Sequence, residues 1–223
     1  SYERGNPDLQ AERAYTASLT AELDAGDKLR ATANFYYNRI DDFIFAEPLD
    51  RPVLTIRGAF PAFEYNQADA RIMGMDWRLD YTFVPRLTLE SRLSLLRAWN
   101  RKTDDYLVFM PADRLQTGLK YTFRAPDGAP EAPFIRLTMV NALEQRRAPA
   151  GTDYAPPPPG YTRLDLEAGA TFVWGNQPFE VGLSVINLLD ARYREYLNRF
   201  RYFVDEPGRN VSLRLRIPFH QNR

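Results

Sequence analysis

The chain has 223 residues, with 29 basic and 29 acidic side chains, one histidine and no cysteine. It therefore has neither disulfide bonds nor thiolate metal ligands. Because His220 is the single histidine, we expect neither a multi-histidine metal centre nor a histidine-based catalytic triad. The mean hydropathy of −0.47, with no long apolar run, excludes a helical membrane span, which requires about 18 consecutive apolar residues. A transmembrane β-barrel is not excluded, because alternating strands average out as polar.

Apolar and polar residues alternate along nearly the whole chain, which predicts β-strands. The first two predicted strands, 14–24 and 29–39, are joined by a tight turn and form a hairpin. The others follow at 71–83, 86–96, 114–123, 134–139, 160–174, 179–185 and 208–219. These roughly nine strands are about ten residues long, the length that crosses a bilayer at a tilt.

The connections between the strands alternate between short and long. The short ones are 24–28, 83–87, 124–133 and 174–179, and the long ones are 43–67, 100–113, 146–160 and 190–208. Outer-membrane barrels have short turns at the periplasmic rim and long loops at the extracellular rim. We therefore predict an all-β fold, an antiparallel transmembrane β-barrel. A soluble barrel or sandwich also alternates, but the loop pattern disfavours it.

The free energy of membrane insertion decides which face of the last strand meets lipid. Arg214 and Arg216 would each cost about 2–4 kcal/mol near the bilayer midplane, so we expect them to face a polar lumen. The same choice turns the charged side of every strand inward. Aromatic residues near the short turns would then form an interfacial girdle; its predicted members are Tyr81, Phe83, Tyr121, Phe123, Phe172, Trp174, Phe179 and Phe219.

Four stretches resemble a known family of membrane proteins. "GNPDLQAERAYTASLTAEL" looks like the NPDL-x-x-E stretch of TonB-dependent outer-membrane receptors, and "ADARIMGMD" resembles their A-x-I-x-G-x-E strand, with Asp76 in place of the usual glutamate. "INLLDARYREYLN" resembles their N-L-[LF]-[DN]-x-x-Y stretch, and "GRNVSLRLRIPF" their closing strand. The matches run from Asn6 to Phe219 in the family's order.

The resemblance implies a plugged barrel of about 22 strands in the bacterial outer membrane. This chain shows only the last nine or so, so we expect residues 1–223 to be the C-terminal portion of such a barrel, without signal peptide, TonB box or plug domain. The implied partners are outer-membrane lipid, the missing N-terminal strands and plug, the TonB complex through that plug, and a small-molecule metal chelate. Neither a cofactor nor nucleic acid is implied.

The implied function is import of a scarce ligand, such as a ferric siderophore or another metal chelate, with haem, a metal ion, cobalamin or a saccharide as other cargoes of the family. The alternative is a plugless barrel fragment that acts as a passive pore or a surface adhesin. Because no catalytic constellation is visible, we do not expect an enzyme.

The segment "ARYREYLNRFRYFVDEPGRN" alternates arginine with aromatic residues. Paired charge and stacking would suit an anionic aromatic chelate, so the candidate ligand-binding residues here are Arg194, Tyr196, Arg199, Arg201 and Tyr202. The same pattern also fits a strand that extends above the membrane, with solvated arginines and packed aromatics.

Two pairs of adjacent carboxylates lie in predicted long loops or beside them. Asp104 and Asp105 are further candidate ligand-binding residues, and Asp41/Asp42 is the other pair. Acids of this kind are either solvated loop residues or part of a metal or chelate site. No metal ligand is assigned.

Overall fold

The computed structural model describes residues 1–125, 132–175 and 177–217. Over these residues the regular secondary structure is β-strand apart from one short 3-10 helix, and none of them belongs to a helix long and apolar enough to span a membrane. The strands and the single 3-10 helix are β1 (Tyr2–Arg4), β2 (Arg13–Asp24), β3 (Leu29–Pro48), β4 (Val53–Thr55), β5 (Gly58–Phe60), β6 (Ala62–Val84), β7 (Leu87–Asn100), β8 (Asp105–Tyr106), β9 (Arg114–Thr122), β10 (Phe134–Ala142), β11 (Tyr161–Trp174), β12 (Gln177–Ile186), η1 (Arg199–Tyr202) and β13 (Asn210–Arg216).

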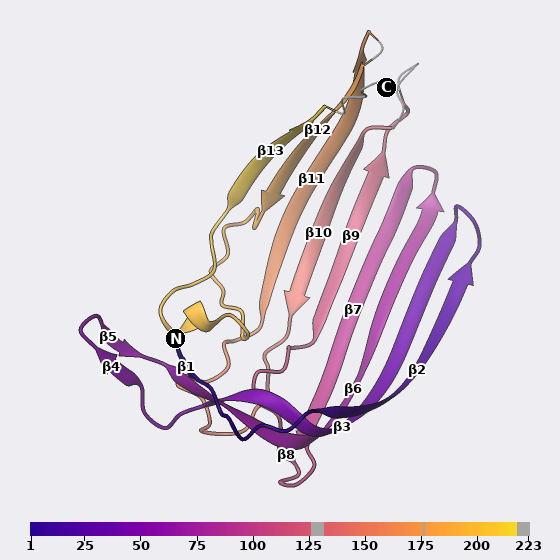
Figure 1. The fold of residues 1–223 in the computed structure, drawn as a ribbon. Helices are drawn as coiled ribbons and strands as arrows, with labels where there is room; N and C mark the ends of the chain where they lie inside the picture. Colours follow the sequence, from indigo (N-terminus) through magenta and orange to yellow (C-terminus); the bar gives the residue numbers. More distant parts are fainter. Residues whose placement is uncertain (126–131, 176, 218–223) are drawn as a thin grey trace, which may run out of the picture.

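Nine long strands form one curved antiparallel sheet in the order β13-β12-β11-β10-β9-β7-β6-β3-β2 (Figure 1). Neighbours in the sheet are neighbours along the chain, which confirms the predicted series of hairpins. β1 adds to β6 and β8 adds to β7 at the long-loop end, while β4 and β5 form a separate small hairpin. The sheet curves without closing, and β2 and β13 are its two edges.

The short turns lie together at one end of the sheet and the long loops at the other, as the sequence predicts (Figure 1). Left-handed backbone makes three turns possible: φ is +66° at Gly26, +70° at Arg86 and +63° at Gly175. The Gly26 N–H also donates to Asp24 Oδ1 at 2.8 Å. Part of the predicted turn 124–133 lies outside the described residues.

The prediction of a long loop over residues 43–67 is wrong for much of this range. β3 continues to Pro48 and β6 starts at Ala62, and the two pair from Phe43 to Pro48. An extra residue in β3 between Ile40 and Phe43 shifts the register, and Asp42 there has φ +61°. Such a β-bulge interrupts the two-residue period, which is why the alternation seemed to end at this point.

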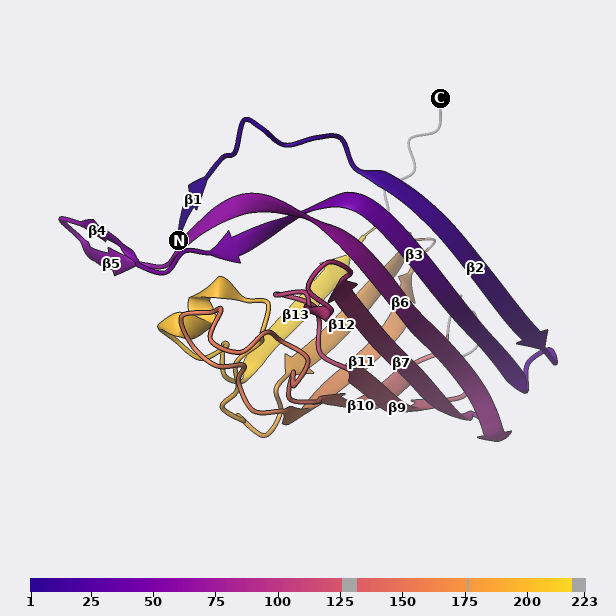
Figure 2. The same cartoon turned by 90° about the horizontal axis from the view of Figure 1, so that it is seen from below.

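The two faces of the sheet have opposite chemistry, and the charged face is the concave one, as predicted. Arg136 lies on it between Glu90 (2.9 Å) and Glu167 (2.6 Å), while Arg163 donates to Tyr193 in a loop that packs inside the curve (Figure 2). The convex face carries apolar rows. One row of directly paired residues runs Leu166, Leu137, Leu119, Leu89, Tyr81 and Leu29.

The predicted aromatic girdle is present at the short-turn end. Tyr121 and Phe123 pack with ring centroids 4.9 Å apart, and Phe172 stacks on Phe179 at 5.4 Å. Tyr81 and Phe83 are also exposed neighbours on the convex face. Phe219 and the side chain of Trp174 lie outside the described part of the chain.

The apolar core lies at the long-loop end of the sheet, where strand residues pack against a loop. Ala68, Ala70, Ala98 and Leu107 are buried together, and partly buried hydrophobic side chains pack against them: Ile40, Phe43, Phe45, Ile72, Leu96 and Met110. Leu107 and Met110 belong to the loop after β8, so this loop folds back onto β3, β6 and β7. The edge strands β2 and β13, in contrast, are exposed at every residue.

Candidate functional site

Three long loops, 101–113, 143–160 and 187–209, gather inside the curve of the sheet (Figure 2). They are tied to one another as well as to the wall. The contacts between them form a single surface at the long-loop end of the concave side, called the mouth below. A ligand entering the concave side from that end would reach this surface first.

The third loop begins at a turn made by Asn187 and Asp190, with φ +58° and +55°. The fully buried Asn187 side chain bonds both the N–H and the C=O of Ala191 at 2.9 Å, and its own N–H donates to Asp165 at 2.9 Å. Asp190 accepts the Arg209 N–H at 2.8 Å, so the two ends of the loop meet. The N-L-L-D motif thus has a structural role, because it sets the base of the loop.

Arg201 in η1 joins the second and third loops. Its side chain is 2 % exposed and forms an ion pair with Asp153, and it donates to the Pro156 carbonyl at 3.0 Å. The Tyr202 hydroxyl donates to the same carboxylate at 2.5 Å. The extended proline tract therefore presents a carbonyl to a buried guanidinium, which satisfies donors that would otherwise be orphaned.

An aromatic cluster lies beside this ion pair. Phe63 has no exposed surface and packs edge-on against Phe109 (5.7 Å) and Tyr154 (6.0 Å). The Tyr154 hydroxyl donates to the Ala62 carbonyl at 3.0 Å, and Tyr196 packs on Phe109 at 6.0 Å. The cluster connects all three loops to the start of β6.

Two tyrosines of the third loop remain protonated well above neutral pH. Burial raises the pKa of Tyr202, and its hydrogen bond to the Asp153 carboxylate raises it further. Burial also raises the pKa of Tyr196, whose oxygen accepts the Phe109 N–H at 3.4 Å. Neither residue is poised for acid–base chemistry near neutral pH.

A second contact ties the third loop to the strands. Glu195 pairs with Arg114 at 2.6 Å and accepts a hydrogen bond from Tyr161. Next to this contact lies a pocket of about 300 Å³ whose lining includes Arg114, Tyr161, Arg194 and Glu195. Its walls bear both positive and negative side chains, so the pocket can receive a polar group.

The structure brings together five of the seven predicted site residues. Arg194 pairs with Asp205 at 2.6 Å and donates to the Arg201 carbonyl at 2.8 Å, while Arg201 stacks on Tyr202 (4.6 Å) and Tyr196 (5.0 Å). Arg199, in the same helical turn as Arg201, pairs with Glu3 and lies over the Phe63 ring at 4.1 Å. All three arginines are thus already engaged within the protein.

Asp104 lies in the turn between β7 and β8, and Asp105 is the first residue of β8, paired with Asn100; both are exposed and neither belongs to the third loop. Asp41 and Asp42 occupy the β3 bulge, where Asp41 pairs with Arg101 at 3.0 Å. Among residues 1–125, 132–175 and 177–217, no three His, Cys, Asp or Glu side chains are grouped so that they could hold a metal ion.

Sequence reasoning missed the partners that organise the site, namely Asp153, Tyr154 and Glu195. Asp153 and Tyr154 lie in the predicted long connection 146–160, just before the prolines that begin at Pro156, and we assigned them no role. Nothing in the local pattern connects Asp153 with Arg201, 48 residues later, because the pairing depends on how two loops meet in space.

Comparison with protein families finds a match over residues 1–188 to the model described as "TonB dependent receptor-like, beta-barrel". No curated protein matches the chain.

Solved structures share the fold. The copper transporter OprC is 21 % identical with a TM-score of 0.75, and the match covers 95 % of this chain and 33 % of that one. A mutant of the ferric enterobactin receptor PfeA from Pseudomonas aeruginosa is 19 % identical, with a TM-score of 0.64 and coverage of 96 % and 32 %. The ferric preacinetobactin receptor BauA from Acinetobacter baumannii is 15 % identical with a TM-score of 0.63, and the match covers 91 % of this chain and 29 % of that one. The chain therefore spans about a third of the length of these proteins.

Proposed function

Because the chain belongs to the TonB-dependent receptor β-barrel family of the bacterial outer membrane, we propose that it forms the C-terminal part of the barrel wall of a receptor that imports a scarce ligand. The family match over residues 1–188 carries this proposal. The receptor binds its ligand at the long-loop mouth, and a plug domain outside this chain passes on the energy supplied through TonB. Nine strands of the wall are present here, and the remaining strands complete the barrel.

A metal chelate is the ligand class that the loop chemistry supports best. The structural neighbours include receptors named for ferric enterobactin and ferric preacinetobactin and a transporter named for copper. In this chain the mouth combines guanidinium groups with aromatic rings, which suits an anionic chelate with aromatic arms, such as a ferric siderophore.

The seven candidate residues divide into two roles within this proposal. Arg194 and Arg199 retain exposed surface and contact the ligand together with the exposed acids Asp104 and Asp105, which face polar or cationic parts of it. Tyr196, Arg201 and Tyr202 are buried or half-buried, and they hold the loop in position beneath those contacts.

The test is uptake of a radiolabelled ferric siderophore by cells that carry the full-length receptor, with and without TonB. We expect uptake that requires TonB and decreases in the Arg194→Ala/Arg199→Ala variant. The control is Arg146→Ala, which removes an exposed arginine from the second loop. Entry that persists without TonB would indicate a passive pore and overturn the proposal.

A further inference from the structure

A row of cross-strand partners crosses the convex face at the long-loop end. In pairing order it runs from Tyr15 on β2 to Arg39 on β3, Arg71 on β6, Trp99 on β7 and Tyr106 on β8. Side chains on one face of a strand repeat every two residues, so this row shares its face with the apolar rows.

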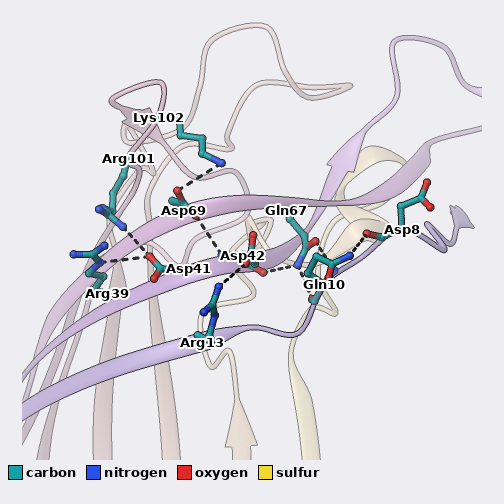
Figure 3. A network of polar contacts seen from close by, with 10 residues as sticks. All are labelled: Asp8, Gln10, Arg13, Arg39, Asp41, Asp42, Gln67, Asp69, Arg101 and Lys102. Carbon is teal, nitrogen blue, oxygen red and sulfur yellow. Dashed lines mark hydrogen bonds and ion pairs between the residues drawn. The ribbon is translucent and has the colours of Figure 1, made fainter.

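On β2, β3 and β6 the row marks the upper limit of the apolar surface. One step nearer the short turns, Tyr37 pairs with Met73, and below them the convex face carries Phe35 and Met75. On β7 the partner of Met73 is Arg97, whose charge is paired with Asp113 at 2.6 Å. One step beyond the row the chemistry becomes polar, with Asp41, Asp69 and Gln67 (Figure 3). Arginine flanked by tyrosine and tryptophan at this level is the composition of a membrane interface.

Arg71 has no counter-charge within the described chain. It makes neither a hydrogen bond nor an ion pair with any described residue, and its buried Nε has no partner. Its guanidinium carbon lies over the Trp99 ring, 4.6 Å from the ring centroid. It also lies directly opposite Arg39, and like charges in that position destabilise a sheet.

The neighbouring carboxylates are already engaged (Figure 3). Asp41 is shared by Arg101 at 3.0 Å and Arg39 at 3.4 Å, and the Arg39 side chain is half exposed, so the second contact neutralises little charge. Asp69 accepts the Asp42 N–H at 3.3 Å and pairs with Lys102 at 3.6 Å.

Two other acids of this region are engaged as well. Asp42 lies 4.0 Å from Arg13, and Glu12 accepts the Ile44 N–H at 2.6 Å. Among the described residues no acid pairs with Arg71, and Arg39 has only its half-exposed contact with Asp41.

We propose that Arg39 and Arg71, between Tyr15 and Trp99, bind the phosphate of a lipid headgroup in the leaflet on the long-loop side. A phosphate between two guanidinium groups accepts charge-assisted hydrogen bonds from both and removes their repulsion. The acyl chains of such a lipid lie along the apolar rows below, and the two aromatic rings bracket its headgroup. The site depends on membrane insertion but not on which ligand the receptor imports.

The experiment is native mass spectrometry of the full-length receptor, titrated in detergent with diphosphoryl lipid A. We expect the Arg39→Gln/Arg71→Gln variant to bind at least tenfold more weakly, which corresponds to about 1.4 kcal/mol, because both charge-assisted donors are lost. The matched control is Arg78→Gln, which changes an arginine on the opposite face of β6 and should bind normally. Arg71→Lys, which keeps the charge and loses the planar fork, should give intermediate affinity.

Folding and lipid binding are separated by the heat-dependent gel mobility of each variant, which should match that of the unaltered receptor. Equal lipid binding by the double glutamine variant would overturn the site. Equal binding of the dephosphorylated lipid would also overturn it. Displacement of the lipid by inorganic phosphate at the same phosphate concentration would overturn it too, because it would indicate a site for the free anion. Uptake of the ferric siderophore is measured separately. A receptor that takes up no siderophore would contradict only the proposed function and not the lipid site.

Discussion

Arg201 and Asp153, 48 residues apart in the chain, form a buried ion pair that joins two long loops. The Arg201 side chain is 2 % exposed and that of Asp153 is 9 % exposed. Because a buried charge without its partner is costly, the pair makes the loops one unit and fixes where η1 lies at the mouth.

Replacing Arg201 with alanine should therefore loosen both loops. Removing one partner of a buried pair costs about 3–5 kcal/mol, since the other charge is left uncompensated. Hydrogen exchange measured on the full-length receptor should show lost protection in 143–160 and 187–209 with the strands unchanged. Arg146→Ala, which removes an exposed arginine from the second loop, should have little effect. Unaltered protection in Arg201→Ala would show that the pair does not hold the loops.

Gly74 on β6 should tolerate no side chain. A Cβ there would lie 2.6 Å from the Leu95 carbonyl oxygen and closer still to the Tyr36 hydroxyl and the ring carbon that bears it. Overpacking of this kind costs about 1–3 kcal/mol, so Gly74→Ala should lower the yield of folded barrel in a lipid refolding titration.

Gly182 provides the matched control, because its nearest neighbour would be 3.9 Å from a new Cβ. Gly182→Ala should refold normally. Adding Tyr36→Ala to Gly74→Ala should restore only part of the yield, because the Leu95 backbone cannot move away. If the two alanine variants refold equally well, the close packing of Tyr36 over Gly74 is not what stabilises this part of the sheet.

The strands themselves were largely predictable from the sequence, because a two-residue period is a local property. The β11 pattern, for example, gives both its length and its charged face, with Arg163, Asp165 and Glu167 on one side. The period fails only where the backbone adds a residue, as at Asp42, and there the continuation of β3 was missed.

The loop site was less predictable. The sequence identified the arginine and aromatic residues of the third loop, but not which of them are buried. That depends on Asp153 and Glu195, whose contacts with Arg201 and Arg114 form only when the chain is folded. Local composition cannot distinguish an arginine available to a ligand from one that holds a loop.

The convex face should reject charge. Leu137 lies in the middle of β10 between Leu119 and Leu166, and Leu137→Arg would place a guanidinium in the lipid at a cost of about 2–4 kcal/mol. Thr138→Arg is the control: Thr138 faces the concave side, where it lines a pocket with Glu90 and Glu167. In a bilayer refolding titration of the full-length receptor, Leu137→Arg should lower the yield of folded barrel and Thr138→Arg should not. Equal tolerance would mean that the convex face does not meet lipid.

The two edges of the sheet bear on the central claim that this chain is part of a barrel wall. β2 and β13 are exposed along their whole lengths and each has a neighbour on one side only. Lipid cannot satisfy the free backbone groups of such edges, and each unsatisfied group costs several kcal/mol. We therefore predict that in the membrane further strands pair with these two edges.

The most direct test is to express residues 1–223 alone, reconstitute them in detergent, and compare heated and unheated samples by gel electrophoresis beside single-channel recordings. The chain alone should give no compact, heat-labile monomeric band, whereas co-expression with the remaining strands of its receptor should restore one. A compact monomeric band from residues 1–223 alone, with a steady and reproducible conductance, would show that the chain closes by itself and would contradict the account.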